Sequence, residues 1–597
     1  MIVLFGENKS RKSLLIANLR PFVAVTHHWL NRMGHLVRRP VTIYIITVCI
    51  ASYGLVQRLA GLGRSLWLDE AWVANSVTAP SLKAMFYYDA WLQTSPPLFL
   101  LLVRSVAFHL GPSNTVFRLI PFLMGIVALV SMLVFVLRTL SRQNALLAWT
   151  LLVLSPVAVD YSKELKQYSS ELAVSTTILL LCSLYIENAT ARRFWMLLGT
   201  VVIGLLVGYA TAFILPGLIV LFCMARSRSG GVFNPNADIS KRFIRSMLLL
   251  VAAGAVLMGE YFLLIKPNSP TALRAYELAT RNVKVDSAQM VAFDSYRLLR
   301  ELPLNHLLRG QGLLITLVGI VLTLGISLAW LRFKAARRKW FLLQLFCLLP
   351  CLLLIVSERF SWYPFSVRTA AFTAPFIIFL VMSSVQLICL FFMQRRRDWT
   401  MPILDIVFLF AVAITINASR RSGLDVPRED MDGAVSLIRA NIRPGDFLWV
   451  HASCREAFKL YTKIDAWHDP PAHYGSTGWP CCAREVPNTL GTFGEALVRR
   501  DFGNALPIDF HGRVWLLYTM RAEHWLGKPN EPQFMQTILK ERGCVELPTR
   551  AFTDLGVRSF NCNQRTSITP VGLEPSGQLA STKEGQVSDA GLPVTAR

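Results

Sequence analysis

The sequence predicts a polytopic α-helical membrane protein that ends in a small soluble domain. Of its 597 residues, 53% are hydrophobic and only 16% are charged, and the mean hydropathy is +0.44. Apolar runs close to the ~20 residues that span a bilayer recur between residues 41 and 418. From residue 424 the composition becomes that of an ordinary globular protein. Together these observations exclude a wholly soluble protein.

Four regions follow from the composition. Residues 1–40 form a basic tail without a small-residue cleavage site, so we expect a retained cytoplasmic N-terminus rather than a cleaved signal. Residues 41–418 form the membrane domain, 424–565 the soluble domain and 566–597 a disordered tail rich in Ser, Thr, Gly and Pro. The net charge of +24 lies mostly in short loops between spans. It is therefore a topology signal, and we expect no nucleic-acid partner.

The basic clusters set the predicted topology. Residues 98–110 are too short to cross and are expected to lie along the interface or against the bundle. Every dense basic cluster then falls on the cytoplasmic side, which gives about 11 spans by the positive-inside rule. The predicted spans are 41–59, 117–137, 145–159, 171–186, 194–210, 212–225, 246–265, 311–331, 340–357, 369–393 and 402–417. The soluble domain is thereby placed outside the cytoplasm, on a multi-pass protein of the cell (inner) membrane.

The soluble domain alternates helical and strand patterns, which favours a small α/β domain with a mainly parallel sheet. Its first helix should start near Asp430, and a later helix should end at Gly543. An extracytoplasmic location permits disulfides, and Cys544 with Cys562 is the pairing that we favour.

Two adjacent acids, Asp69 and Glu70, stand out in the first outer loop, Gly61–Pro97. They lie between Trp67 and Trp72, and tryptophan prefers the membrane–water interface. Acids beside a membrane are unfavourable unless they are solvated, paired or used. The pattern favours a short interfacial helix whose carboxylates face water or a cavity. The alternative is a solvated loop with two surface acids.

Two further polar clusters fall on the same predicted side. One runs from Asp160 to Tyr168; continued as a helix, it would place Lys163, Gln167 and Glu171 on one face. It is either a salt-bridged turn or a site that uses a carboxylate and a cation together. The other contains Arg359 and Arg368, whose guanidinium groups are shaped to bind phosphate.

These motifs resemble, in the same order, the GT-C superfamily of membrane glycosyltransferases. The matching segments are SLWLDEAWVANSV, SPPLFLLLVRSVAFHLGPSNTVFRLIPFLMGIVAL and SPVAVDYSKELKQYSSELAV. The similarity is to the bacterial branch that is like dolichyl-phosphate-mannose protein mannosyltransferases and lipid A aminoarabinose transferases. It covers about residues 40–420 and, more loosely, the soluble domain. It implies a GT-C-like fold and transfer of a sugar from a polyprenyl-phosphate donor, with inversion, at the outer membrane face.

The resemblance also implies roles for residues. The family's acidic pair falls on Asp69 and Glu70, which are the implied catalytic residues. Asp69 would be the general base or the group that orients the acceptor nucleophile. The family's tyrosine–serine–x–glutamate turn falls on Tyr161, Ser162 and Glu164, and its following basic residue on Lys166. The late arginine–tyrosine motif falls on Arg368, where the tyrosine is replaced by Thr369, and Ser95 replaces the usual His or Lys before Pro96-Pro97. The substrate-binding set is Tyr161, Lys163, Glu164, Lys166, Arg359 and Arg368.

The chemistry requires a base for the acceptor hydroxyl and cations for the developing phosphate charge. No residue is assigned as a metal ligand, although a divalent ion between Asp69 or Glu70 and Glu164 stays open because hard cations favour carboxylates. The acceptor can be a lipid, a glycan or a protein. Two alternatives remain: a transporter or flippase of lipid-linked saccharides, and an inactive assembly protein.

Overall fold

The computed structural model describes most of the membrane domain and the core of the soluble domain. The residues it describes are 40–88, 95–224, 235–267, 325, 338–359, 368–393, 429–451, 454–464, 482–484, 499, 502, 506–519, 531–550, 552 and 555–563. The predicted spans 311–331 and 402–417 and the predicted tail therefore lie outside the described residues, Gly325 excepted.

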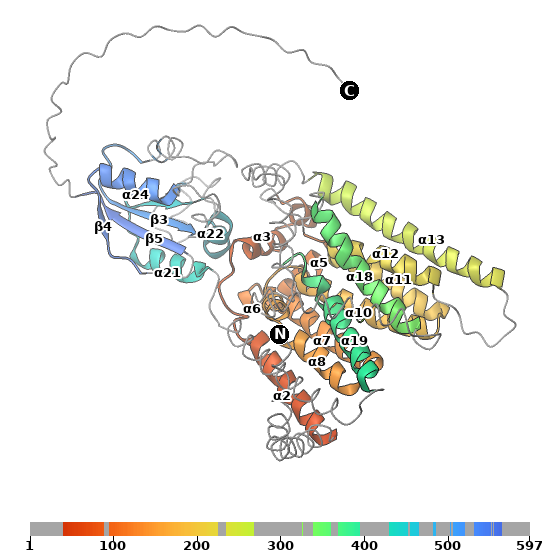
Figure 1. Cartoon of the computed structure of the whole chain (residues 1–597). Helices are drawn as coiled ribbons and strands as arrows, with labels where there is room; N and C mark the ends of the chain where they lie inside the picture. Colours follow the sequence, from red (N-terminus) through yellow and green to blue (C-terminus); the bar gives the residue numbers. More distant parts are fainter. Residues whose placement is uncertain are drawn as a thin grey trace, which may run out of the picture.

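Helices make up the membrane domain (Figure 1). The first group is α2 (Pro40–Leu59), α3 (Leu68–Val77), α4 (Leu82–Phe86), α5 (Pro97–Leu110), α6 (Asn114–Phe117), α7 (Leu119–Thr139), α8 (Arg142–Val153), α9 (Pro156–Tyr161) and α10 (Tyr168–Glu187). The second group is α11 (Ala191–Val207), the 3-10 helix η1 (Tyr209–Ile214), α12 (Leu215–Met224), α13 (Pro235–Glu260), the π-helix η2 (Tyr261–Ile265), α18 (Arg338–Arg359), the 3-10 helix η4 (Ala371–Thr373) and α19 (Ala374–Met393).

Five of the described helices are long and apolar enough to cross a membrane. They are Leu119–Thr139, Tyr168–Glu187, Ser240–Ile265, Lys339–Ser357 and Ala371–Ile388. Tyr44–Leu59, Pro97–Leu110 and Tyr209–Met224 are shorter apolar helices. The total of about 11 spans stays a prediction from the positive-inside rule. The 14-residue length of α5 agrees with its assignment as a helix that does not cross.

Basic side chains from several helices gather at one end of the bundle. Arg138 at the end of α7 and Lys339 at the start of α18 both pair with Glu187 at the end of α10, at 2.8 and 2.5 Å. Arg245 of α13 donates to the Tyr185 hydroxyl and the Ala189 carbonyl nearby. This grouping agrees with the predicted placement of the basic clusters on one side of the membrane. The acidic loop before α7 and the start of α10 lie at the other end.

Helix α10 is the centre of the bundle. It packs against α7, α11, α18 and α19, and most of its residues are buried. A helix enclosed on all sides needs small residues where neighbouring backbones come close. Gly125 of α7 and Gly208 after α11 meet this need, since a Cβ on Gly208 would lie 2.2 Å from the Glu171 side chain.

The segment from Ser155 to Gln167 differs from the prediction in two ways. The predicted span 145–159 is two helices, because Pro156 cannot continue α8 and instead starts α9, where the Ser155 hydroxyl accepts from the Ala158 amide. The expected helix through Lys163 and Gln167 is wrong: residues 162–167 form turns. The reason is that the Leu165 amide donates to the Glu70 carboxylate instead of to a helical carbonyl.

The soluble domain contains one five-stranded sheet. Its strands are β1 (Phe447–Val450), β2 (Cys482–Arg484), β3 (Arg513–Thr519), β4 (Val545–Leu547) and β5 (Leu555–Asn561), in the order β2-β1-β3-β5-β4. Its helices are α21 (Met431–Asn441), which Asp430 caps as predicted, α22 (Arg455–Thr462) and α24 (Glu531–Glu541), with Gly543 after its end in the left-handed conformation.

The expectation of a mainly parallel sheet is wrong, because the sheet is mixed. Strand β1 pairs in parallel with β2 and β3, whereas β5 pairs antiparallel with β3 and β4. Parallel strands need a long crossover, but the short connection from β4 to β5 permits only a hairpin. Alternate residues along β1 and β3 then enter cores on opposite faces of the sheet.

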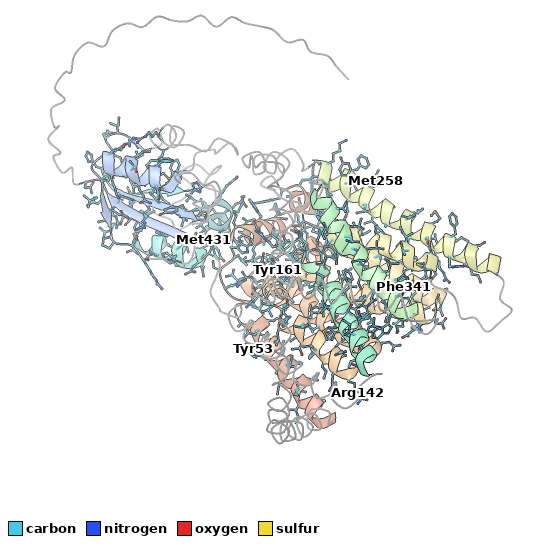
Figure 2. The ribbon with its side chains drawn as sticks, in the orientation of Figure 1. Tyr53, Arg142, Tyr161, Met258, Phe341 and Met431 are labelled. Atoms are coloured by element: carbon cyan, nitrogen blue, oxygen red, sulfur yellow. A yellow bond between two sulfur atoms is a disulfide. The ribbon has the colours of Figure 1, made fainter. Side chains whose placement is uncertain are left out.

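One face of the domain lies against helix α3 in the first outer loop of the membrane domain (Figure 1). A single apolar core contains Ala71, Val73 and Val77 of α3 together with Met431 and Phe458 of the domain. Figure 2 shows Met431 on the side of the domain that adjoins the membrane helices. The domain and the outer loop thus share their interior rather than meet through a polar surface.

The favoured disulfide is confirmed, since Cys544 and Cys562 are bonded across the ends of β4 and β5. We expect that changing both residues to Ser lowers the free energy of unfolding of the domain by about 2–4 kcal/mol, because the cross-link restricts the unfolded chain. The measurement is thermal unfolding of the purified protein with and without reductant.

The control is Cys49→Ser, which removes an exposed free thiol of α2 and should leave the response to reductant unchanged. Peptide mapping that finds Cys544 and Cys562 alkylated without reduction would contradict the assignment.

Candidate active site

Helix α3 carries the two adjacent acids in its first turn, where negative charge interacts favourably with the free backbone N–H groups. Consecutive helical residues point about 100° apart, so the two carboxylates face different surroundings. The Glu70 side chain is completely buried, whereas the Asp69 side chain is 13% exposed. The structure therefore separates two residues that look equivalent in the sequence.

Glu70 is held by a buried ion pair with Arg118, which lies between α6 and α7. The guanidinium donates from Nε to Oε1 at 2.7 Å and from Nη2 to Oε2 at 2.5 Å. Burial by itself raises the pKa of a carboxyl, but the charge and hydrogen bonds of Arg118, with smaller contributions from Arg64 and the Leu165 amide, hold the pKa of Glu70 below its ordinary value. Glu70 is thus a carboxylate with its oxygens already engaged.

The same pair fixes the backbone around it. Arg118 donates from Nη1 to the carbonyls of Leu62 (2.9 Å) and Arg64 (2.5 Å) and from Nη2 to that of Ser65 (3.1 Å). Glu70 also accepts from the Leu165 amide at 2.7 Å. One ion pair therefore joins the loop before α3, the start of α7 and the turn between α9 and α10.

Asp69 pairs with Arg368, just before η4. Arg368 Nη1 donates to Asp69 Oδ2 at 2.5 Å, and the guanidinium lies over the Trp67 ring, 5.2 Å from its centroid. Burial lowers the pKa of Arg368, but the electrostatic interactions with Asp69, Tyr168, Glu164 and Tyr161 together outweigh it, and the net direction is upward. With its side chain 35% exposed, Arg368 keeps donors available to another anion.

The turn before α10 adds further polar groups to this cluster. Lys166 is almost completely buried, and Glu164 is fully buried. Burial lowers the pKa of Lys166, and the positive charge of Arg368 lowers it further. The negative charges of Asp69, Glu164 and Glu70 act in the opposite direction, but the net shift of the pKa is downward. These electrostatic interactions place the ammonium group among the charges around Asp69.

Two tyrosines complete the cluster. The rings of Tyr161 and Tyr168 lie 5.1 Å apart and pack against Ala371, next to the segment that carries Arg368. Tyr161 lies in the interior of the membrane domain, near the middle of the molecule in Figure 2. The two rings form an aromatic wall beside the charged groups.

Not every predicted residue joins this cluster. Lys163 is buried and donates to the Gln57 carbonyl at the end of α2, at 3.2 Å. Arg359 ends α18, and its side chain lies outside the described residues. Within the part of the chain that the structure describes, no group of three or more His, Cys, Asp or Glu side chains could hold a metal ion.

Sequence reasoning missed Arg118, which contacts the acidic loop most extensively. A signal was present, because Arg118 is a lone arginine at the predicted outer end of an apolar run, opposite to the basic clusters. Such a residue needs a buried acid as its partner. Arg104 lies in the segment 98–110, for which the sequence predicts only an interfacial helix. In the structure it donates to the Val77 and Ala79 carbonyls and caps the C-terminal end of α3.

Comparisons with solved structures give membrane glycosyltransferases. ArnT from Cupriavidus metallidurans in the apo state has 10% identity and a TM-score of 0.47, over 86% of this chain and 97% of that one. The Archaeoglobus fulgidus oligosaccharyltransferase in the apo form has 11% identity and a TM-score of 0.47, over 83% and 72%. The same archaeal enzyme, AglB, with an inhibitory peptide and a dolichol-phosphate has 12% identity and a TM-score of 0.46, over 86% and 74%.

These proteins are members of the GT-C superfamily, which the sequence motifs also resemble. No protein-family model and no curated protein matches the chain. At such identities and TM-scores the likeness decides neither a substrate nor the role of any residue. What the site can do depends on its own side chains.

We expect Glu70→Gln to lower the free energy of unfolding by about 3–5 kcal/mol, because it leaves the buried Arg118 charge without a counter-charge. The pair should contribute fully above the ordinary carboxyl pKa of about 4.3 and be lost as the pH falls through the lowered folded value. Unfolding in mixed micelles across pH 3–7 measures both effects.

Glu187→Gln is the matched control, since it disrupts an ion pair that is partly exposed. Such pairs contribute roughly 0–1 kcal/mol. Equal losses in the two variants would show that the buried pair is not the stronger constraint.

Proposed function

We propose that the protein is an integral membrane glycosyltransferase. It moves a sugar from a polyprenyl-phosphate donor to a lipid, glycan or protein acceptor. The reaction takes place at the outer face of the bacterial inner membrane and inverts the anomeric centre. The single observation that carries this proposal is the partly exposed Asp69 carboxylate that pairs with Arg368.

This arrangement matches the needs of the reaction. A phosphate-linked sugar already has a leaving group, so the protein needs a base for the acceptor and positive charge for the phosphate. Arg368 has exposed surface and the planar fork that binds phosphate in a bidentate manner. In the structure this guanidinium pairs with Asp69. A donor phosphate that binds the Arg368 guanidinium would release the Asp69 carboxylate, which could then accept the proton of the acceptor hydroxyl.

The transfer step then follows from these positions. The acceptor oxygen attacks the anomeric carbon from the face opposite the phosphate, and its proton goes to Asp69. The bond from the anomeric carbon to the phosphate oxygen breaks, and its electron pair stays on the polyprenyl phosphate. Arg368 and Lys166 stabilise that charge, while Tyr161 and Glu164 stay candidates for substrate binding on the grounds of the sequence resemblance. One displacement gives inversion.

Glu70 takes a different part in this proposal. Both of its oxygens already accept hydrogen bonds from Arg118, and one also accepts from Leu165. We therefore assign Glu70 to positioning α3 and leave the proton transfer to Asp69. Lys163 and Arg359 stay candidates for substrate binding on the grounds of the sequence resemblance.

Asp69→Asn should abolish sugar transfer, with at least a 100-fold loss, because a general base contributes about 10²–10⁴-fold. The measurement is mass spectrometry of lipid-linked sugars and envelope glycans in cells that lack the protein and carry the variant. One glycan should lose one sugar, and its polyprenyl-phosphate donor should accumulate.

Asp509→Asn changes an exposed acid of the soluble domain and serves as the control. Full transfer by a correctly inserted Asp69→Asn protein would refute the assignment of the base. A transporter would instead move labelled lipid-linked sugar across liposomes without altering it.

Arg368→Met should weaken binding of undecaprenyl phosphate to the purified protein about tenfold or more, since a hydrogen bond to a charged group contributes about 1.5–3 kcal/mol. The affinity of Arg368→Lys for undecaprenyl phosphate should lie between those of the wild type and of Arg368→Met, because lysine keeps the positive charge but not the planar fork of donors. Arg138→Met, which changes the opposite end of the bundle, should bind normally. Unchanged affinity in Arg368→Met would remove Arg368 from the phosphate site.

A further inference from the structure

The C-terminal domain contacts the loop that carries Asp69 through polar side chains as well as through the shared core. Glu456 is 2% exposed and sits at the start of α22, which packs against α3. It accepts from Asn75 Nδ2 at its carboxylate (2.9 Å) and at its backbone carbonyl (2.8 Å). The Tyr88 hydroxyl also donates to the carboxylate, at 2.6 Å.

Tyr461, from the same helix, contacts the chain on the N-terminal side of Asp69. Its hydroxyl accepts from the Leu66 amide at 2.7 Å, lies 3.3 Å from the Ser65 hydroxyl, and donates to Asn114 at 3.2 Å. Burial raises the pKa of Tyr461, so the hydroxyl keeps the proton that it donates. One phenol oxygen therefore joins the loop before α3 to the first residue of α6.

A third contact reaches the residue next to Asp69. Glu429 is 2% exposed, and its carboxylate accepts from the Leu68 amide, the first of α3, at 3.1 Å. The Asp432 amide donates to the Ser65 hydroxyl at 3.1 Å. Contacts from the domain thus lie on the N-terminal side of Asp69, through Glu429 and Tyr461, and on its C-terminal side, through Glu456.

The geometry points to Glu456 and Tyr461 as positioning residues of the transfer reaction. The C-terminal domain sets the rotation and axial position of α3, and with them the direction of the Asp69 carboxylate. A base that must meet an acceptor hydroxyl tolerates little displacement, because a shift of about 1 Å can reduce the rate about 100-fold. The domain thereby becomes part of the catalytic apparatus, and this inference rests on the proposed function of Asp69.

Two variants test this inference in the full-length protein. Glu456→Ala removes the carboxylate that accepts hydrogen bonds from Asn75 and Tyr88. Tyr461→Phe removes a single oxygen atom. We expect each to reduce the sugar-transfer product in complemented cells about tenfold or more, at matched protein levels. Binding of undecaprenyl phosphate should stay within about twofold of wild type, because Arg368 is untouched. Glu456→Gln keeps an acceptor oxygen and should restore most of the product.

Matched controls come from the far face of the same domain. Glu546→Ala disrupts a partly exposed pair with Arg558, and Tyr518→Phe removes a hydroxyl that accepts from Gln536. Both should give wild-type amounts of product.

The outcomes separate this inference from the proposed function. Wild-type amounts of product from Glu456→Ala and Tyr461→Phe overturn the positioning role. A loss of product also overturns it if undecaprenyl phosphate binding is lost as well, or if Glu456→Gln does not restore the product. If Asp69→Asn is inactive while both variants are active, only the positioning role fails. If Asp69→Asn is active, the proposed function itself fails.

Discussion

The buried ion pair between Glu70 and Arg118 is the constraint on which the outer end of the membrane domain depends. Two charges are removed from water, so their hydrogen bonds must be satisfied in one geometry. Arg118 meets this condition by donating to Glu70 and to three backbone carbonyls of the loop before α3. A pair of this kind contributes little net stability compared with apolar packing, but its loss is unfavourable, and it fixes one arrangement of three chain segments.

This arrangement explains why neighbouring acids have different environments. Glu70 is held in the interior with its oxygens engaged, whereas Asp69 stays at the edge of a cluster that contains Arg368, Lys166 and two tyrosine rings. The cluster is cationic near the carboxylate and aromatic beside it.

The soluble domain is integrated with the membrane domain. Its helices α21 and α22 complete the apolar core of α3, and its side chains bind the Leu66 and Leu68 amides before Asp69 and the Asn75 side chain after it. Helix α3 is only 10 residues long, which is too short to be stable alone in water. Its position depends on α5, on Arg118 and on the domain together. Asp69 therefore has rigid support although α3 lies in the first outer loop.

The sequence by itself determined the membrane class and the start of a helix at Asp430, because hydrophobicity and capping act over a few residues. It also indicated the disulfide between Cys544 and Cys562. It also placed Asp69, Lys166 and Arg368 among the candidates. Only the tertiary structure decided that Glu70 is buried against Arg118, that Lys163 turns to α2, and that residues 162–167 are not helical. Asp69 and Arg368 are 299 residues apart in the chain, and Leu66 and Tyr461 are 395 apart. No local pattern encodes such contacts, since they form only when separate elements pack together.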